Sequence, residues 1–340
     1  MKLDMKTWLT RLALLSLVAP AWPATAGAQE FETIGSRAAG MGGAFVAVAD
    51  DASAAYWNPA GFAAGSFFSL VLDRASAKLN PDAGPAGSRS GWLLALGAPP
   101  LGLSYYRLRG TVLLPGPLPT GAGGDGRNNP GAGEVRLDTL VSHHIGATLV
   151  QTVAPGVAVG ATLKLVRGTA VSVVQPDGDR DELLEDAGDL VGKGSTKFDA
   201  DLGVMATVGR VKAGLTLRNA TAPGFDSAGG GPALKLERQA RAGLAITPLG
   251  GWIVSADVDL TKTAGPLGQV RHVAAGTEAR VARRHYLRGG ARFNTVDERA
   301  AALSFGGSFG VTASLLVDAQ VTVGSDRTHR GWGISARLGY

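Results

Sequence analysis

The chain has 340 residues with a formal net charge of +5, 45% hydrophobic residues, 50 glycines, 17 prolines and no cysteine. Without cysteine there can be no disulfide framework, thiolate metal site or cysteine nucleophile. The glycine content disfavours an all-helical protein, because each interior glycine costs a helix about 1 kcal/mol. The hydrophobic content excludes a wholly disordered chain, and the dispersed positive charge does not indicate a nucleic-acid partner.

The N-terminus has the three-part layout of a secretory signal peptide. Basic residues among the first eleven precede an apolar run over residues 12–19, and the small residues 26–28 form a cleavage site ahead of Gln29. A membrane anchor helix is the alternative, but the run is short and is followed by two prolines. We therefore expect residues 1–28 to be removed on export.

From residue 67 onward, apolar and polar residues alternate with period two, which is typical of strands with one apolar face. In residues 211–218, for example, every odd position is apolar and every even position is small or polar. No stretch after the signal peptide offers about 18 uninterrupted apolar residues for a spanning helix. The pattern predicts fourteen strands, at residues 67–78, 90–97, 101–109, 135–150, 155–168, 196–208, 210–219, 233–247, 251–261, 270–281, 286–294, 299–308, 311–323 and 331–340.

The connections between these predicted strands alternate between long and short along the chain. Outer-membrane barrels have this asymmetry, with long external loops and short periplasmic turns. We therefore predict an all-β fold, a transmembrane antiparallel β-barrel of about 14 strands over residues 67–340; a soluble β-sandwich is the alternative. Charges at mid-strand predict a wet, polar lumen: Lys164, Lys212, Arg218, Lys235, Glu237, Arg241, Asp257, Asp259, Arg271, Glu278, Arg280, Arg288 and Arg292.

The last predicted strand ends on Tyr340, with apolar residues at every second position before it. This pattern resembles the C-terminal signal that barrel-assembly machinery recognises, although an ordinary last strand is the alternative. We expect that machinery to be a partner during biogenesis.

Residues 31–66 do not alternate, and they are rich in glycine and poor in charge. Such a segment can pack closely inside a lumen, so we predict an N-terminal hatch over residues 29–66. Its glycines tolerate changes of backbone conformation, and Pro59 fixes one hinge end. The candidate hatch and ligand-passage residues are Gly40, Met41, Gly42, Gly43, Asn58, Pro59, Ala60 and Gly61.

The sequence from residue 35 reads Gly-x-Arg-x-x-Gly-Met-Gly-Gly-Ala-Phe-Val-Ala-x-Ala-Asp-Asp-x-Ser-Ala, and Asn-Pro-Ala-Gly follows at residues 58–61. This motif resembles the start of the FadL/TodX-type outer-membrane transport proteins, and it is equally similar to the related PorV/PorQ group. The resemblance implies a monomeric 14-stranded barrel with an N-terminal hatch, in which Asn58, Pro59 and Ala60 match the family's hatch motif. In FadL-type members, hydrophobic molecules enter from outside and leave sideways through a gap in the wall.

We therefore expect a non-enzymatic barrel in the bacterial outer membrane for uptake or passage of hydrophobic small molecules such as long-chain fatty acids. Its expected partners are outer-membrane lipid and the hydrophobic solute, which would bind an apolar pocket above the hatch. We expect the lateral gap at the strand 101–109, beside Pro99, Pro100 and Gly102. The chain is shorter than typical FadL proteins, and this favours the alternative: a PorV/PorQ-like barrel that serves a secretion system as a cargo-docking or scaffold protein.

No motif predicts catalysis, a metal site or a cofactor. Residues 306–310 match the spacing Gly-x-Ser-x-Gly, but a nucleophile elbow needs a strand-to-helix turn, so we interpret them as a tight hairpin between strands. His143 and His144 are adjacent on a strand and must point to opposite faces. Acidic residues crowd positions 177–189; we interpret them as a solvated, helical loop, and a calcium site is the alternative.

Overall fold

A computed structural model describes most of the chain, at residues 34–81, 84–116, 133–187, 190–297, 299–325 and 329–340. The signal peptide predicted at residues 1–28 lies outside these residues, so its removal stays a prediction. None of the described helices is both long and apolar enough to cross a membrane.

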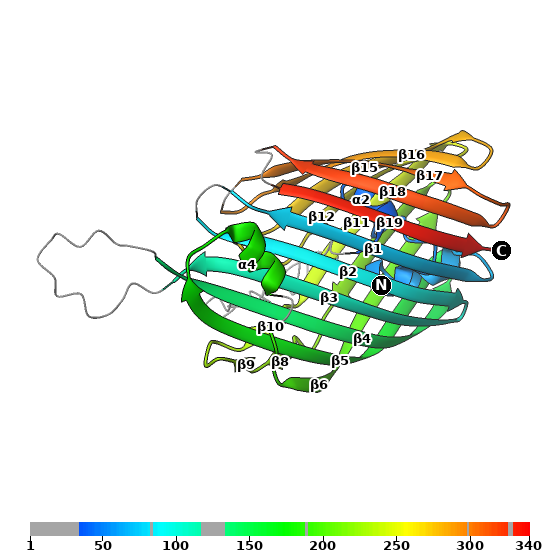
Figure 1. Cartoon of the computed structure of the whole chain (residues 1–340). Coiled ribbons are helices and arrows are strands. Elements are labelled where there is room, and N and C mark those ends of the chain that lie inside the picture. The colour runs from blue at the N-terminus through cyan, green and yellow to red at the C-terminus, as the bar shows by residue number, and fades with distance from the viewer. Residues whose placement is uncertain (1–33, 82–83, 117–132, 188–189, 298, 326–328) are drawn as a thin grey trace, which may run out of the picture.

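Fourteen antiparallel strands close into one barrel (Figure 1), which confirms the predicted fold class. Each strand pairs with its neighbour along the chain, and the barrel closes where the last strand pairs with the first along its whole length. The strands are β1 (Ser69–Leu79), β2 (Ala86–Ala98), β3 (Leu101–Pro115), β4 (Glu134–Ala154), β5 (Val157–Pro176), β6 (Gly194–Val208), β7 (Val211–Arg218), β11 (Gln239–Leu249), β12 (Trp252–Asp259), β15 (His272–Ala282), β16 (His285–Asn294), β17 (Ala301–Gly310), β18 (Leu315–Gly324) and β19 (His329–Gly339).

Each predicted strand corresponds to one of these, and the main differences lie at the loop ends of β2, β3, β5 and β11. The observed β3 and β5 reach Pro115 and Pro176, beyond the predicted ends at residues 109 and 168. The extra residues pack under a helix of the β5–β6 loop, so tertiary contacts extend the ladder past the region where the alternation is clear.

Alternate residues of each strand face the outside and the lumen. On β4, Ile145 and Leu149 point outward and are exposed, whereas the residues that precede them, His144 and Thr148, point inward and are buried. Exposed leucines, valines and phenylalanines cover the outside on all fourteen strands, as a closed barrel in lipid requires.

The prediction of a wet lumen is wrong, although the charged side chains do point inward. Lys164, Arg218, Arg241 and Arg288 are each at most 4% exposed. Little of the middle of the lumen is open to water because residues 34–66 fill the barrel, as the blue segment inside the strands shows (Figure 1). The lumen is therefore the core of the protein.

The segment inside the barrel contains two short α-helices and a 3-10 helix: α2 (Ser36–Gly40), α3 (Ala54–Trp57) and η2 (Pro59–Ala64). Its aromatic side chains form the centre of the hydrophobic core with the inward face of the wall. Tyr56 meets Tyr106 of β3 edge to face, with ring centroids 5.3 Å apart, and Trp57 contacts Phe45 in the same way at 5.7 Å. Such contacts fix the segment's position as well as burying apolar area.

Two of the connections at the loop end fold into the mouth of the barrel. The β7–β11 connection contains β8 (Gly224–Phe225), β9 (Ser227–Ala228) and β10 (Leu234–Lys235); β9 adds to β5 in parallel, and β8 pairs with β10. Phe225 lies against Gly168 on the inward face of β5, and the hairpin of β13 (Thr263–Gly265) and β14 (Gly268–Val270) places Pro266 against Gly87. These loops narrow the entrance from the outside.

The helix α4 (Arg180–Asp186) lies instead on the outer surface of the barrel, across the ends of β2 to β5 (Figure 1). Leu184 packs there with outward residues such as Leu113 and Leu137. Arg109 donates hydrogen bonds to the carbonyl oxygens of Leu184 and Glu185, at 3.0 and 3.2 Å. The Asp179 carboxylate caps the helix by accepting from two backbone N–H groups, as an N-cap aspartate commonly does.

Candidate ligand passage through the barrel

A ring of inward-facing glycines on the wall gives room to the inner segment. A Cβ at Gly290 or Gly276 would collide with the backbone of Met41, and a Cβ at Gly214 would collide with that of Val46. Because glycine has no Cβ, two backbones can approach closely only at such positions. A Cβ at each of the following wall glycines would meet a backbone or side-chain atom of residues 34–66: Gly91, Gly97, Gly102, Gly160, Gly203, Gly214, Gly243, Gly276, Gly290, Gly306 and Gly333.

Asn58 ties the inner segment to itself and to the wall. Its buried amide donates to the carbonyl oxygens of Val46 at 2.9 Å and of Val204 on β6 at 3.2 Å. Its side-chain oxygen accepts from the N–H of Ala60 at 3.1 Å, which caps η2. An amide is the side chain that can both donate to two carbonyl groups and accept at the same site.

Acidic side chains on the wall hold the backbone N–H groups of the inner segment. The Asp73 carboxylate of β1 accepts from Gly35 and Ser36, at 2.9 and 2.6 Å, at the start of α2. The Asp257 carboxylate of β12 accepts from Phe45 and Val46, both at 2.9 Å. These bonds satisfy N–H groups that would otherwise be buried without a partner.

Arg37 of α2 is the centre of a buried ionic network between the inner segment and the wall. Its guanidinium contacts Glu278 of β15 at 2.8 Å, and also Asp50 and Asp51 at 2.5 and 3.0 Å. Burial alone would lower the pKa of Arg37, but the three carboxylates raise it well above its ordinary range. The group therefore stays charged, and its three ion pairs offset the free-energy cost of removing the charge from water.

The same network continues into the wall away from Arg37. Arg288 of β16 contacts Glu278 at 2.5 Å and Asp318 of β18 at 3.1 Å. Arg337 of β19 joins Asp318 to Asp51 of the inner segment, at 2.6 and 3.2 Å. Four strands and the inner segment are thus connected by one set of alternating charges.

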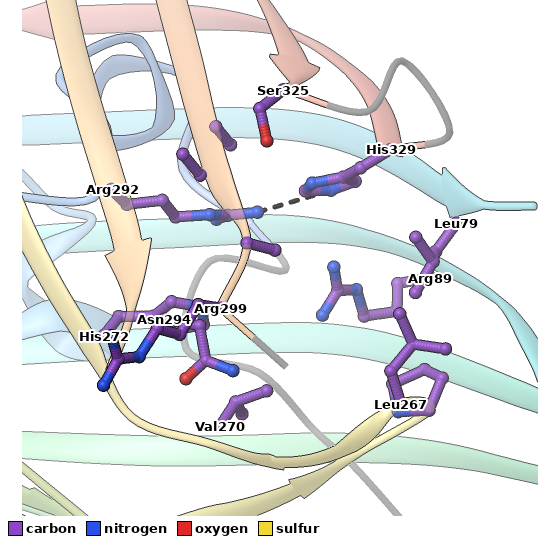
Figure 2. Close-up of a pocket in the computed structure, with 14 residues that line it drawn as sticks. Leu79, Arg89, Leu267, Val270, His272, Arg292, Asn294, Arg299, Ser325 and His329 are labelled. Carbon is purple, nitrogen blue, oxygen red and sulfur yellow. Dashed lines mark hydrogen bonds between the residues drawn. The ribbon is translucent and has the colours of Figure 1, made fainter. Parts of the chain in front are cut away.

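An outer cavity of about 180 Å³ lies at the end where β13 and β14 cover the mouth, and it is lined by loops and by the ends of strands (Figure 2). Its lining combines apolar groups with cationic ones. Arg292 donates to the ring nitrogen of His329 at 3.3 Å across this space. The apolar residues that line it are Leu79, Pro266, Leu267, Val270, Ala300, Ala301 and Ala302, and the basic residues are Arg89, His272, Arg292, Arg299 and His329. The expected pocket above the hatch is therefore amphipathic, and no carboxylate lines it among the described residues.

A second cavity, of about 410 Å³, lies on the other side of the inner segment, at the end with short turns. Its lining includes Arg37 and Asp51, together with Tyr340 of the wall. Between the two lies a space of only about 20 Å³ that shares Arg89 and Arg292 with the outer cavity and reaches Ala39 of α2. The five-residue helix α2 therefore separates the two cavities.

The structure brings the predicted hatch residues into the lumen, all of them buried. Gly40, Met41, Gly42 and Gly43 lie at the end of α2, against β16 and β17. Asn58, Pro59, Ala60 and Gly61 lie against β5 and β6. The two groups are therefore on different sides of the barrel, and neither lines the small space of about 20 Å³, which is reached by Ala39 of α2.

The opening expected beside Pro99, Pro100 and Gly102 is not present along the described length of β2, β3 and β4. β3 pairs with both neighbours from Leu101 onward without a register shift. Pro99 and Pro100 form the turn before β3, where no ladder N–H is needed. Gly102 makes room on the lumen side for the ring of Phe62. Proline and glycine here serve a turn and a close contact, so their presence in the sequence does not indicate a weak wall.

Two further predictions about chemistry can be compared with the structure. Residues 306–310 do not form a hairpin, because they are the end of strand β17. Gly306 faces the lumen there and lies against Gly40. The acidic residues 177–189 include the helix α4, and no group of three metal-ligating side chains occurs among the described residues.

The contacts of the wall glycines and the basic residues that line the outer cavity were not predicted from the sequence. The glycines had a readable signal: on many predicted strands, a glycine occupies a position of lumen parity. The cavity had none, because Arg89, Arg292 and His329 come from hairpins far apart in the chain and are brought together only by barrel closure.

The fold and this interior define a class of protein, the closed 14-stranded antiparallel β-barrel with its lumen filled by an N-terminal segment. The same fold occurs in a solved structure of the CymD monoaromatic hydrocarbon channel, with a TM-score of 0.65 and 13% identity over 92% of this chain and 99% of that one. It also occurs in the P. putida toluene transporter TodX, with a TM-score of 0.58 and 13% identity over 92% and 99% of the two chains. A Pseudomonas aeruginosa FadL homologue has a TM-score of 0.58 at 12% identity, over 89% and 97%.

Comparison with family models gives a different and partial match. Residues 134–259 match the family described as "F plasmid transfer operon, TraF, protein". A comparison with curated protein sequences gives no match. At these identities the solved structures establish the fold, and the fold agrees with the resemblance carried by the N-terminal motif.

Proposed function

We propose that this protein is a non-enzymatic barrel of the bacterial outer membrane that passes hydrophobic small molecules from the outside toward the cell. The observation that carries the proposal is the pair of cavities on the two sides of α2: Arg37 lines the inner one, and Ala39 lines the small space next to the outer one. The printed names of CymD and TodX, a hydrocarbon channel and a toluene transporter, support transport of hydrophobic compounds.

The outer cavity favours an amphipathic carboxylate, such as a long-chain fatty acid, over a neutral hydrocarbon. Its apolar lining suits an acyl chain, and Arg89, Arg292 and Arg299 supply positive charge for a carboxylate. Arginine forms strong, directional hydrogen bonds with carboxylates. A neutral ligand would supply no negative charge to pair with these arginines.

Passage requires residues of the inner segment to move, and α2 is the element whose movement connects the cavities. It is short, it is followed by Gly42 with a positive φ of 68°, and it is bonded to the wall by the Arg37 network and by Asp73. The hatch of our proposal is therefore α2 with Gly40, Met41, Gly42 and Gly43. The η2 side, with Asn58 and Pro59, acts as the fixed end.

A designed disulfide tests this movement, and a chain without cysteine is well suited to it. A Cβ at Gly40 would lie 3.6 Å from the Cβ of Arg288, within the range of natural disulfides. We would make the double variant Gly40→Cys with Arg288→Cys and measure uptake of labelled hexadecanoate by Gram-negative cells that lack their own fatty-acid channel.

Uptake should be blocked in the oxidised variant and restored by a reductant in the same cells. The reduced state is the matched control, because both states lack the Arg288 guanidinium. Equal uptake in the two states, with the crosslink verified by mass spectrometry, would refute passage through α2.

Ligand class is tested separately with Arg299→Gln, because Arg299 is exposed and not part of the buried network. We expect slower uptake of hexadecanoate and unchanged uptake of toluene. Equal effects on both compounds would contradict recognition of a carboxylate.

A role in a secretion system is the second candidate, and the match of residues 134–259 to a transfer-operon family favours it. In that case the barrel would dock or scaffold a protein, and uptake would not depend on α2. Crosslinking in cells, followed by mass spectrometry, would show a stable protein partner on the external loops.

We also propose that the barrel acts as a monomer that barrel-assembly machinery inserts through its last strand. β19 pairs with β1 over its whole length, and Tyr340 extends the ladder by donating to Phe68 at 3.0 Å. Removal of Tyr340 should lower the amount of inserted protein without changing the uptake rate per inserted barrel.

A further inference from the structure

An uneven boundary of the apolar band on the outside of the barrel suggests a binding surface for lipid headgroups. On β18, five successive outward positions from Leu315 to Val323 are apolar. On β1, the apolar run ends at Leu72, and the next outward position is Arg74. On β3 it ends at Tyr105, and Arg107 follows. The run of outward apolar residues is therefore shorter on β1 and β3 than on β18.

Three arginines lie on one register row across this region. Arg74 pairs in register with Trp92, Trp92 with Arg107, Arg107 with His143, and His143 with Arg167. The arginines thus occur on every second strand, about 10 Å apart, since neighbouring strands are about 4.8 Å apart. All five positions have the parity of the exposed outward residues.

No carboxylate in the described residues forms an ion pair with Arg74, Arg107 or Arg167. Arg74 and Arg167 are exposed, and Arg107 is half-buried. The acidic helix α4 lies farther out, and its charges have other contacts: Lys78 contacts Asp181 at 3.3 Å. The row is therefore a cationic shelf between α4 and the apolar band.

The shelf also carries aromatic groups suited to the water–lipid boundary. Trp92 meets Tyr105 with ring centroids 4.8 Å apart, and the Tyr105 hydroxyl lies 2.8 Å from the Nδ1 atom of His143. Tryptophan and tyrosine are enriched at this depth of a membrane. Trp92 and His143 lie on the same register row as the arginines, and Tyr105 lies beside this row.

From this arrangement we infer that the cationic shelf, Arg74, Arg107 and Arg167, binds the phosphate groups of a glycolipid in the outer leaflet. The inference rests on the proposed membrane location, but not on the proposed transport. Guanidinium groups pair with phosphate through two parallel hydrogen bonds. Several spaced cations favour a lipid with more than one phosphate, and the apolar residues below the shelf would contact its acyl chains.

The test measures binding of fluorescent bisphosphorylated lipid A to the detergent-solubilised full chain. The test variant combines Arg74→Gln, Arg107→Gln and Arg167→Gln. The control combines Arg280→Gln, Arg283→Gln and Arg284→Gln, which removes the same charge from exposed positions at the opposite end. Both must show the heat-modifiable gel mobility of a folded barrel.

We expect the test variant to bind lipid A at least about tenfold more weakly and the control to bind like the wild type. Dephosphorylated lipid A should bind the wild type and test variant equally weakly. Inorganic phosphate at millimolar concentration should not displace lipid A, since the acyl chains contribute to binding. The inference would be overturned if the test variant and the wild type bound lipid A with equal affinity, or if the wild type bound dephosphorylated lipid A as tightly as it binds lipid A.

This outcome is independent of the proposed transport. Loss of lipid A binding with normal hexadecanoate uptake would support the shelf alone. Normal lipid A binding by the test variant, together with normal uptake, would refute the shelf and leave the passage intact.

Discussion

At the scale of single residues, the interior is organised by glycines that face the lumen. Gly290 and Gly289 are neighbours on β16, but only Gly290 contacts Met41 and Gly42, whereas a Cβ at Gly289 would meet nothing. Because successive residues of a strand face opposite sides, one of these glycines packs against the inner segment and the other has open space around it.

We expect Gly290→Ala to displace the inner segment and Gly289→Ala to leave it in place. The added methyl of Gly290→Ala collides with backbone, and overpacking of this kind costs about 1–3 kcal/mol. Trypsin cleavage after Arg37, followed by mass spectrometry, measures the displacement. Similar cleavage rates in the two variants would contradict the close packing.

Asn58 provides a second residue-scale prediction, because its amide donates to two carbonyl oxygens. In Asn58→Asp the side chain can no longer donate, and the buried carbonyl groups of Val46 and Val204 face another acceptor. We expect a loss of about 2 kcal/mol or more in the stability of the inner segment. Hydrogen exchange of residues 44–61 measures it, with Gln269→Glu, an exposed amide-to-acid change, as the control. Unchanged exchange in Asn58→Asp would count against this role.

At the scale of elements, α2 and the wall are held together by charge in a region where most other contacts are apolar. Asp51 lies between Arg37 and Arg337 at 3.0 and 3.2 Å. Burial alone would raise the pKa of the Asp51 carboxyl, but the two guanidinium groups lower it below its ordinary value of 3.8.

This lowered pKa fixes the sign of a pH effect. A carboxyl with a lowered pKa in the folded state adds stability above its ordinary pKa, and that contribution is lost as the pH falls through the folded value. We therefore expect protection of α2 from hydrogen exchange to be constant from pH 8 to 5 and to fall below about pH 3.8. In Asp51→Asn the protection should already be reduced at pH 7. A loss of protection between pH 8 and 5 would show that a different group controls α2.

At the scale of the whole molecule, the barrel exposes apolar side chains outward and buries charges inward. This inversion of a soluble protein is stable only when lipid surrounds the outside. Phe305 of β17, at 61% exposure, is the third of five outward positions and lies near the middle of the apolar band.

Phe305→Arg should therefore cost about 2–4 kcal/mol in lipid vesicles, since a lipid-facing arginine is most unfavourable near the midplane. The control is Val191→Arg, in the β5–β6 loop and 90% exposed, which should cost less than about 0.5 kcal/mol. Urea unfolding in vesicles, followed by tryptophan fluorescence, gives both values. Equal costs would argue against burial of Phe305 in lipid.

Much of the fold was predictable from residues 67–340, because a two-residue period and hairpin lengths are local properties of the chain. Residues such as Val211 to Arg218 determine by themselves that they form a strand with two different faces. The N-terminal motif likewise indicated a family fold. Local pattern could not show whether Pro99, Pro100 and Gly102 weaken the wall, since that depends on which strands and rings lie beside them.

The sequence by itself determined the strand count, the closed barrel and the inward direction of the charged side chains. Only the tertiary structure decided that these charges are dry, that Arg37 joins Glu278 across 241 positions of the chain, and that Arg292 meets His329 over the outer cavity. The physical reason is barrel closure. Alternation sets which face a residue takes, but the residues that share that face at one height come from distant strands and depend on register and on the segment that fills the lumen.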